Sequence, residues 1–175
     1  MLLGILVALG VLAVLWVAWN LTLDALWQPS DRITVRRMLV LAGVSSQDHV
    51  VDLGCGDGRV VVAAARDFGA KASGVEIDPI RVLWGKLWIW LAGVARRADI
   101  CRGNMYDADL SEADVVVLFL SPISNLRLQE KLKRELKPGS RVVSYYHDRW
   151  GWKPAEVGES KRGYPVYLYR IGEVS

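Results

Sequence analysis

The feature that most constrains the fold is a glycine-rich turn that follows a short apolar strand, within residues 50–60. A strand ending at Asp52-Leu53 leads into this turn, and a helical pattern starts at Arg59. Three glycines alternate with other residues in the turn: Gly54, Gly56 and Gly58. Glycines this close allow the backbone to approach a ligand where a Cβ atom would clash, and the free N–H groups at a helix start favour an anionic group. The turn therefore predicts a strand–loop–helix unit that binds a small ligand.

Strand and helix signals alternate along the rest of the chain. Apolar runs predict strands near residues 49–53, 73–77, 98–101, 114–120, 141–147 and 164–171. Helical patterns lie near residues 31–42, 59–68, 79–95 and 123–136. Strands as apolar as the run from Val115 to Leu120 suit a sheet that is covered on both faces. We therefore expect an α/β fold with a doubly wound, mainly parallel sheet.

The first 23 residues form the longest apolar stretch of the chain. Met1 to Trp19 carries no charge, and a helix of this length rises about 28 Å, close to the roughly 30 Å hydrocarbon core of a bilayer. A signal peptide would need a basic start and a small-residue cleavage site, and neither is visible. Arginines follow the stretch and none precedes it. We expect a transmembrane anchor at residues 1–23 and a domain at residues 24–175 that faces the cytoplasm.

Composition argues against nucleic acid and metal ions as ligands. The formal net charge is only +3, and no lysine-rich run occurs. Cys55 and Cys101 lack the spacing of metal ligands, and His49 and His147 are the only histidines. We expect both cysteines to be reduced structural residues. The sequence does not define the oligomeric state.

Three acidic residues are placed to line a site beside the glycine turn. In doubly wound sheets, ligands bind beyond the carboxyl ends of the strands, where Asp52 and Glu76 are expected; Asp57 lies in the turn itself. A carboxylate at Glu76, about twenty residues after the turn, suits the two hydroxyls of a ribose. The glycine spacing differs from the G-x-G-x-x-G of dinucleotide-binding proteins. The alternative is that Asp57 only forms the turn and that Glu76 is an exposed charge.

The turn and the preceding Asp52-Leu53 pair resemble the nucleoside-binding loop of class I S-adenosylmethionine-dependent methyltransferases. The resemblance implies a Rossmann-like methyltransferase fold with seven strands and S-adenosylmethionine as the cofactor. The cofactor-binding residues implied are Asp52, Gly54, Gly56, Asp57, Gly58, Glu76, Ile77, Asn104 and Met105. Asn104 would meet the adenine amino group and Met105 or Ile77 would pack on the ring, whereas a plain turn role is the alternative for Asn104.

Further segments are similar to a small archaeal family of protein-lysine methyltransferases and to its membrane-attached mitochondrial relatives. They are Pro29-Ser30, Val35 to Leu39, Val51 to Arg59, Arg134 to Ser144, Gly151-Trp152-x-Pro154 and Tyr167 to Tyr169. The resemblance covers most of residues 27–172 and implies methyl transfer to a lysine side chain of a protein. The family tends to have a histidine and a carboxylate just after the equivalent of Ser144, whereas this chain has Tyr145-Tyr146-His147-Asp148.

The acceptor side is expected at the carboxyl end of the fifth strand. The Asn/Asp-Pro-Pro-aromatic motif of enzymes that methylate base amines or glutamine is absent, since residues 119–122 read Phe-Leu-Ser-Pro. An enzyme of this kind mainly aligns an uncharged amine, and an apolar or aromatic pocket lowers the pKa of a lysine. The candidate catalytic residues are Tyr145, Tyr146, His147 and Asp148, each with a purely structural role as the alternative; Ser121 and Asn125 are weaker candidates.

The expected helix at residues 79–95 is rich in tryptophan. A helical wheel predicts that one stripe covers the sheet: Ile80, Leu83, Leu87, Leu91 and Val94. Trp84 and Trp88 flank this stripe, and we expect them to rest in a membrane interface with Arg96 and Arg97 near lipid head groups. Core packing and a dimer contact are the alternatives.

These features together predict a membrane-anchored methyltransferase that modifies a protein lysine, with a bilayer and a membrane-associated protein as partners. A lipid or quinone methyltransferase remains an alternative, as does a catalytically silent module that only binds S-adenosylmethionine. A narrow aromatic channel would favour lysine, whereas a deep apolar slot would favour a lipid or quinone. A blocked methyl end would favour the silent module.

Overall fold

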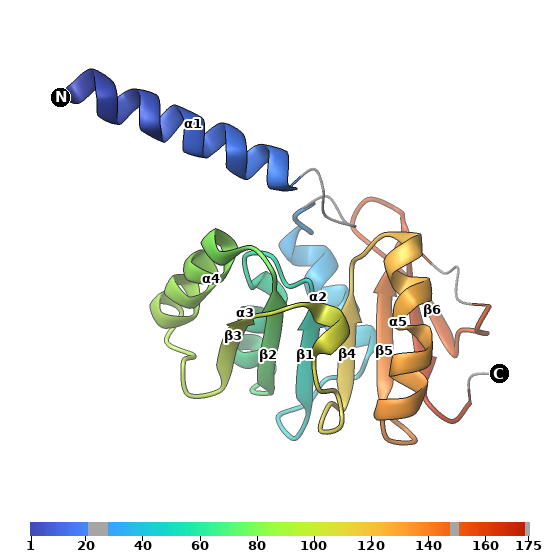
Figure 1. Ribbon diagram of the computed structural model, residues 1–175. Helices are drawn as coiled ribbons and strands as arrows, with labels where there is room; N and C mark the ends of the chain where they lie inside the picture. Colours follow the sequence, from blue (N-terminus) through green and yellow to red (C-terminus); the bar gives the residue numbers. More distant parts are fainter. Residues whose placement is uncertain (21–27, 148–150, 174–175) are drawn as a thin grey trace.

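The computed structural model describes residues 1–20, 28–147 and 151–173. A seven-stranded sheet with the order β3-β2-β1-β4-β5-β7-β6 forms the centre of the domain (Figure 1). Strands β1 to β5 run parallel, whereas β7 is antiparallel to both of its neighbours, β5 and β6. The Rossmann-like fold is therefore confirmed, with a mixed sheet in which the carboxyl ends of five parallel strands share one edge.

The elements follow the predicted alternation of strands and helices. The strands are β1 His49–Leu53, β2 Lys71–Glu76, β3 Ala98–Arg102, β4 Val115–Leu118, β5 Arg141–Tyr145, β6 Glu156–Glu159 and β7 Pro165–Arg170. The helices are α1 Leu2–Asn20, α2 Arg32–Leu41, α3 Arg59–Asp67, α4 Pro79–Leu91 and α5 Pro122–Glu135, with a short 3₁₀ helix, η1, at Met105–Asp107. The individual strand predictions missed β6, because this edge strand is mostly exposed and carries a glutamate at each end.

Side-chain caps explain where two of the helices begin. The Asp31 carboxylate accepts hydrogen bonds from the backbone N–H groups of Ile33 and Thr34, at 3.1 and 3.0 Å, and so starts α2 as predicted. Asp78 starts α4 in the same way, with its Oδ1 atom 2.8 Å from Ile80 N. Pro79 follows Asp78 at the first helical position, where a missing N–H group costs nothing.

The hydrophobic core has two parts, one on each face of the sheet. Helices α2, α3 and α4 contribute to the first part, which contains the fully buried residues Leu39, Val61 and Ile100. Helix α5 contributes to the second part, in which Leu128 and Tyr169 are fully buried. This three-layer arrangement is what the apolar strands predicted.

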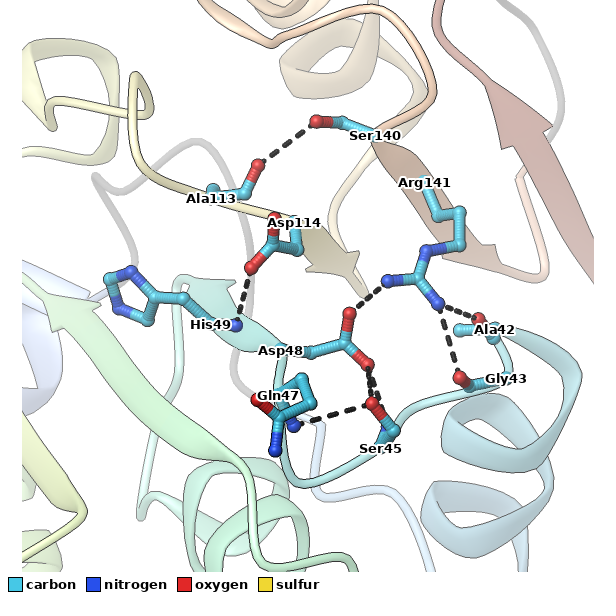
Figure 2. A network of polar contacts seen from close by, with 10 residues as sticks. All are labelled: Ala42, Gly43, Ser45, Gln47, Asp48, His49, Ala113, Asp114, Ser140 and Arg141. Carbon is cyan, nitrogen blue, oxygen red and sulfur yellow. Dashed lines mark hydrogen bonds and ion pairs between the residues drawn. The ribbon is translucent and has the colours of Figure 1, made fainter.

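A polar network ties together the amino-terminal ends of the central strands (Figure 2). Arg141 at the start of β5 forms an ion pair with Asp48, and its Nη1 atom donates to Ala42 O at 2.8 Å. Asp48 Oδ2 accepts a 2.6 Å hydrogen bond from Ser45 N, and Asp114 Oδ2 accepts one from His49 N at 2.8 Å. This edge of the sheet is closed by internal contacts, which leaves the opposite edge for a ligand.

The structure does not support the predicted transmembrane anchor at residues 1–23. Helix α1 ends at Asn20, and residues 21–23 lie outside the described part of the chain. Within residues 1–20, 28–147 and 151–173, no helix combines the length and apolar character needed to cross a membrane. The cytoplasmic orientation of the domain stays a prediction.

The predicted sheet-covering stripe of α4 is wrong. Four of its members are exposed: Ile80, Leu83, Leu87 and Leu91. The helix instead buries Val82, Gly85 and Ile89. A Cβ atom on Gly85 would lie 3.2 Å from Asp57 O, so the missing side chain allows α4 to approach the glycine turn closely. A helical wheel that considers only large apolar residues does not identify a buried face that includes a glycine.

Candidate active site

A pocket of about 320 Å³ lies at the carboxyl ends of β1, β2 and β4. Its walls come from the glycine turn, from the segments after β2, β3 and β4, and from residues 28–30, which precede α2. It contains eight of the nine predicted cofactor residues: Asp52, Gly54, Gly56, Asp57, Glu76, Ile77, Asn104 and Met105. The sequence did not predict the contribution of residues 28–30, although Pro29-Ser30 belongs to the segments that carry the resemblance.

All three glycines of the turn have a left-handed backbone, with φ angles of 73°, 56° and 79° for Gly54, Gly56 and Gly58. This conformation is strained for other residues. Gly58 does not line the pocket; a Cβ atom there would lie 2.4 Å from Ile100 Cδ1 and 3.7 Å from Gly85 Cα. The absence of a side chain at Gly58 therefore allows close packing with α4 and the sheet, and its contact with the cofactor stays a prediction.

Glu76 holds the glycine turn against the end of β2. Its carboxylate is 95% buried; Oε2 accepts a 2.8 Å hydrogen bond from Gly56 N, and Oε1 accepts one from Asp78 N at 2.9 Å. Arg81 Nη1 lies 3.7 Å from Oε1. Hydrogen bonds of this kind to a charged group fix its position, so the carboxylate faces the pocket in one orientation. The contact of Glu76 with the ribose hydroxyls stays a prediction.

Asp57 is paired with an arginine that the sequence did not single out. Arg59 Nε lies 2.9 Å from Asp57 Oδ1, and Arg59 Nη2 lies 2.5 Å from Asp57 Oδ2. Arg59 Nη1 also donates a hydrogen bond to Ser30 O. The bidentate pair partly neutralises the charge of Asp57. It also attaches the segment before α2 to the glycine turn, so residues 28–30 become a wall of the pocket.

Asp52 is a fully buried acid in this pocket. Burial raises its pKa to about 8, and repulsion from Glu76 and Asp57 adds to the effect. Asp52 therefore carries a proton near neutral pH when no positive ligand is present. Burial likewise raises the pKa of the neighbouring Cys55 thiol, which agrees with the predicted structural role of that cysteine. Cys101 is a free, exposed thiol.

The predicted adenine contacts lie in the pocket wall after β2 and β3. Asn104 caps η1, because its Oδ1 atom accepts a 3.1 Å hydrogen bond from Tyr106 N. The turn role weighed for Asn104 is therefore present, and its adenine contact stays a prediction. Met105 is half-buried and Ile77 is exposed, so both offer apolar surface to a planar ring.

The predicted catalytic residues lie beside the pocket rather than in its wall. Phe119 lines the pocket, and its ring centroid lies 4.5 Å from that of the buried Tyr145. Tyr146 is exposed, and its ring lies 6.5 Å from Tyr145 and 4.9 Å from Tyr164. Phe119, Tyr145, Tyr146 and Tyr164 thus form a row of neighbouring rings, here called the aromatic path, that runs from the pocket wall to the surface. Asp148 lies outside the described residues.

A buried asparagine supports the turn that carries these tyrosines. Asn125 Nδ2 donates to Ser144 Oγ at 3.2 Å and to His147 O at 3.4 Å, and Ser144 Oγ donates to His147 O at 2.8 Å. Tyr146 has a φ angle of 72°, which is unusual for a residue with a side chain. Asn125 Oδ1 is buried and has no hydrogen-bond partner within the described residues. Ser121, the other weaker candidate, caps α5 through Ser124 N at 3.1 Å.

The residues present fit S-adenosylmethionine. Asp52, Asp57 and Glu76 offer acidic groups to the ammonium and the ribose, and the left-handed glycine turn brings backbone close to the pocket. Val117, Phe119 and Leu120 supply an apolar wall at the end of β4. A mostly apolar pocket with a few fixed polar groups is typical of a small-molecule site.

Comparison with known proteins agrees with this geometry. The model of the ANTKMT methyltransferase domain matches residues 52–156, which is more than half of the chain. The chain belongs to this methyltransferase family. It is therefore an S-adenosylmethionine-dependent methyltransferase.

The curated relatives of this methyltransferase include enzymes whose names give lysine as the methyl acceptor. A protein-lysine N-methyltransferase of Saccharolobus islandicus (strain REY15A) is 48% identical over 83% of this chain and 92% of its own length. The adenine nucleotide translocase lysine N-methyltransferase of Mus musculus is 38% identical over 63% of this chain, which spans only 48% of the mouse protein.

A solved structure with the same fold contains the product form of the cofactor. It is an RNA methyltransferase from Salinibacter ruber in complex with S-adenosyl-L-homocysteine, with a TM-score of 0.81. Its sequence is 41% identical over 83% of this chain and 95% of its own. The cofactor assignment of the methyltransferase therefore rests on its family, on this complex and on the pocket.

Proposed function

We propose that this methyltransferase transfers a methyl group to the ε-amine of a lysine in a protein. The observation that carries the proposal is the aromatic path, which connects Phe119 in the pocket wall with the exposed Tyr146. Support comes from the name of the archaeal relative that is 48% identical. A lysine side chain is long, thin and apolar up to its terminal nitrogen, so it fits an approach lined by aromatic rings.

The aromatic path would prepare the amine for the reaction. Rings beside the ammonium hold it by cation–π attraction at the exposed end, and burial near Phe119 lowers the pKa of the lysine so that it loses a proton. S-adenosylmethionine supplies a methyl group on a positively charged sulfur. The amine nitrogen forms a bond to the methyl carbon while the carbon–sulfur bond breaks, and the sulfur keeps that electron pair. The new methylammonium then releases a proton to water.

Different residues of the chain would orient the cofactor and hold the amine. Glu76 would orient the ribose, and the glycine turn would fix the end of the cofactor that carries the carboxylate. Tyr146 and His147, whose rings lie 4.6 Å apart, would hold the amine at the outer end of the path. Such alignment for in-line attack contributes most of what this reaction needs from an enzyme.

RNA methylation is a second candidate, because the Salinibacter ruber structure that is 41% identical carries that name. The absent Asn/Asp-Pro-Pro-aromatic motif and the low net charge argue against a base amine as acceptor. A lipid or quinone acceptor is a third candidate and a silent binding module is a fourth. One experiment separates all four.

The experiment incubates the full chain with cofactor labelled on its methyl group and with whole-cell extract. Protein, RNA and lipid are then separated and counted. A parallel extract, in which protein lysines have been blocked by acetylation, serves as the matched control. We expect label in the protein fraction of the first extract, loss of that label in the blocked extract, and a mass increase on lysine.

The exposed Tyr146 allows a variant test that spares the fold. Tyr146→Ala should reduce labelling without changing cofactor affinity, whereas Val157→Ala, on the exposed edge strand β6, should change neither. Label in RNA or lipid alone would contradict the proposal. Cofactor binding without label in any fraction would favour the silent module.

A further inference from the structure

Helix α4 has an outer face that no described part of the chain covers. Its exposed members are Ile80, Leu83, Trp84, Leu87, Trp90 and Leu91. Leu83 is 72% exposed and Trp90 is 69% exposed, so these large side chains lie almost entirely in solvent. Trp88 packs partly against the core and does not belong to this face. Contiguous apolar patches of this kind mark interaction sites.

Most charged side chains around the outer face of α4 are basic. From residue 79 to residue 97 the chain contains arginines and a lysine but no acidic residue. Arg96 and Arg97 are exposed just after the helix, and Lys86 is exposed on it. Asp99, which follows this stretch, lies 3.5 Å from Lys86. Apolar and indole side chains beside basic ones fit a surface with anionic head groups above a hydrocarbon layer.

Helix α1 adds a second apolar surface beside α4. Its Trp16 Nε1 atom donates a 2.9 Å hydrogen bond to Asp78 Oδ2, so α1 contacts the residue that caps α4. Figure 1 shows α1 extending away from the domain on the side that carries α4. Helix α1 has no charged residue, and its exposed side chains include Leu6, Val14 and Leu15. Helices α1 and α4 therefore present two exposed apolar surfaces on either side of one contact.

We propose that the outer face of α4 docks on the surface of an anionic lipid bilayer. The tryptophans suit this partner because an indole places its ring in the apolar layer and its N–H group at the head groups. The basic residues suit it because lysine and arginine side chains near an anionic surface are attracted to its head groups. A folded protein partner would bury these side chains equally well, but the uncharged, mainly apolar helix α1 beside them favours lipid.

Docking in this way would bring the active site close to the membrane surface. Helix α4 starts three residues after Glu76, and Ile77 and Arg81 belong to the pocket wall. The acceptor would then be a group at or near the bilayer. The docking itself does not depend on which acceptor the enzyme uses.

The test compares two labelled positions on the full chain. In a Cys101→Ser background, Leu83→Cys or Leu126→Cys carries an environment-sensitive fluorophore, since Cys55 is buried. Leu126 is a matched control, because it is a leucine exposed on helix α5, away from α4. Each protein is mixed with vesicles of phosphatidylcholine and phosphatidylglycerol, and quenching by iodide is measured. We expect a blue shift and several-fold weaker quenching at position 83, with neither change at position 126.

Equal quenching at the two positions with vesicles present would overturn the proposal. Protection of position 83 without vesicles, growing with protein concentration, would also overturn it and would make the face a contact between copies. Replacing Arg96 and Arg97 with glutamine should weaken the protection at position 83, and added salt should do the same. Unchanged cofactor affinity in every variant shows that the fold is intact.

Discussion

The two halves of the active site are built from different kinds of contact. On the cofactor side, the key partners are close in the chain or lie on adjacent strands. Glu76 at the end of β2 bonds Gly56 in the turn after β1, and Arg59 pairs with Asp57 two residues away. A short strand–turn–helix unit and one neighbouring strand therefore define this half almost completely.

The acceptor side is assembled from segments that are far apart in the sequence. Asn125 on α5 bonds Ser144 and the carbonyl of His147, and Tyr146 N donates to Pro165 O at 2.9 Å. The ring of Tyr145 reaches the pocket only through Phe119. Each of these contacts depends on tertiary packing rather than on a local pattern.

The comparison indicates which half tolerates change. A site that is fixed by a local turn fails when that turn is altered, because few other contacts can replace it. A site that is assembled by several long-range contacts should lose alignment gradually. The cofactor half should therefore show the larger effects on binding, and the acceptor half should show smaller effects on rate.

Glu76→Ala should produce the largest effect. It removes two hydrogen bonds from a charged group, each worth about 1.5–3 kcal/mol, together with the expected ribose contact. We expect cofactor affinity to fall roughly 1,000-fold, which corresponds to about 4 kcal/mol, as measured by isothermal titration calorimetry. Glu112→Ala is the control, because Glu112 is exposed and contacts Lys137 at the opposite edge of the sheet. An affinity within a few-fold of the original would show that the cofactor half does not depend on this carboxylate.

Gly58→Ala should have the next largest effect, on stability. An alanine would meet Ile100 Cδ1 at 2.4 Å and would adopt a φ angle of 79°. The left-handed conformation costs about 1–2 kcal/mol, and overpacking adds about 1–3 kcal/mol. Urea unfolding should therefore show a loss of about 3 kcal/mol. Gly93→Ala shares the left-handed backbone but meets nothing within 4 Å, so it should lose only the conformational part.

The local half was also the half that the sequence could predict. Asp52, Glu76 and the glycines lie where their spacing placed them, because strand ends and left-handed turns have few alternatives. The packing of Gly58 against Ile100 was not predicted, because it depends on how closely α4 approaches the glycine turn. That approach is set by Gly85, which has no side chain to appear in a hydrophobic pattern.

Side-chain partners could not be predicted for the same reason, even within the cofactor half. Arg59 reads as an ordinary first residue of a helix, and nothing local indicates that it reaches Asp57 and Ser30 together. Tyr145 and Tyr146 were placed at the end of the correct strand, but their distance from the pocket depends on Phe119. The outward orientation of Leu83 shows that apolar periodicity does not say which apolar face meets the sheet when a helix has two.

Asn125→Ala tests whether the contacts of the acceptor half affect the reaction rate or only the stability of the fold. The substitution removes the two hydrogen bonds to Ser144 and His147 O, so the turn at Tyr146 loses its support. We expect kcat to fall about tenfold, equivalent to about 1.4 kcal/mol, with an unchanged cofactor dissociation constant. Steady-state kinetics with the identified acceptor and calorimetry with the cofactor provide the two readouts. A loss of stability without a change in kcat, compared with Leu126→Ala, would make Asn125 purely structural.

The smallest effect concerns the pH dependence of cofactor binding, and Asp52 determines its sign. The pKa of Asp52 is raised from 3.8 to about 8 in the free protein, so this acid is protonated at pH 7. A cofactor with net positive charge favours the ionised form and therefore lowers that pKa, which releases a proton on binding. Affinity should then rise with pH between 6 and 8, by about fivefold in total, and level off above that range.

Calorimetry in two buffers with different ionisation enthalpies measures the released proton directly. Asp52→Asn should remove both the proton release and the pH dependence. S-adenosylhomocysteine lacks the sulfonium charge and should show a shallower dependence than S-adenosylmethionine. The stability of the free protein should move the opposite way and fall as pH rises from about 4 towards 8, since the folded state holds the Asp52 proton more tightly than the unfolded chain. Affinity that is flat with pH in the unmodified protein would show that Asp52 is already ionised, and the charge balance of the cofactor half would then depend on the Asp57–Arg59 pair alone.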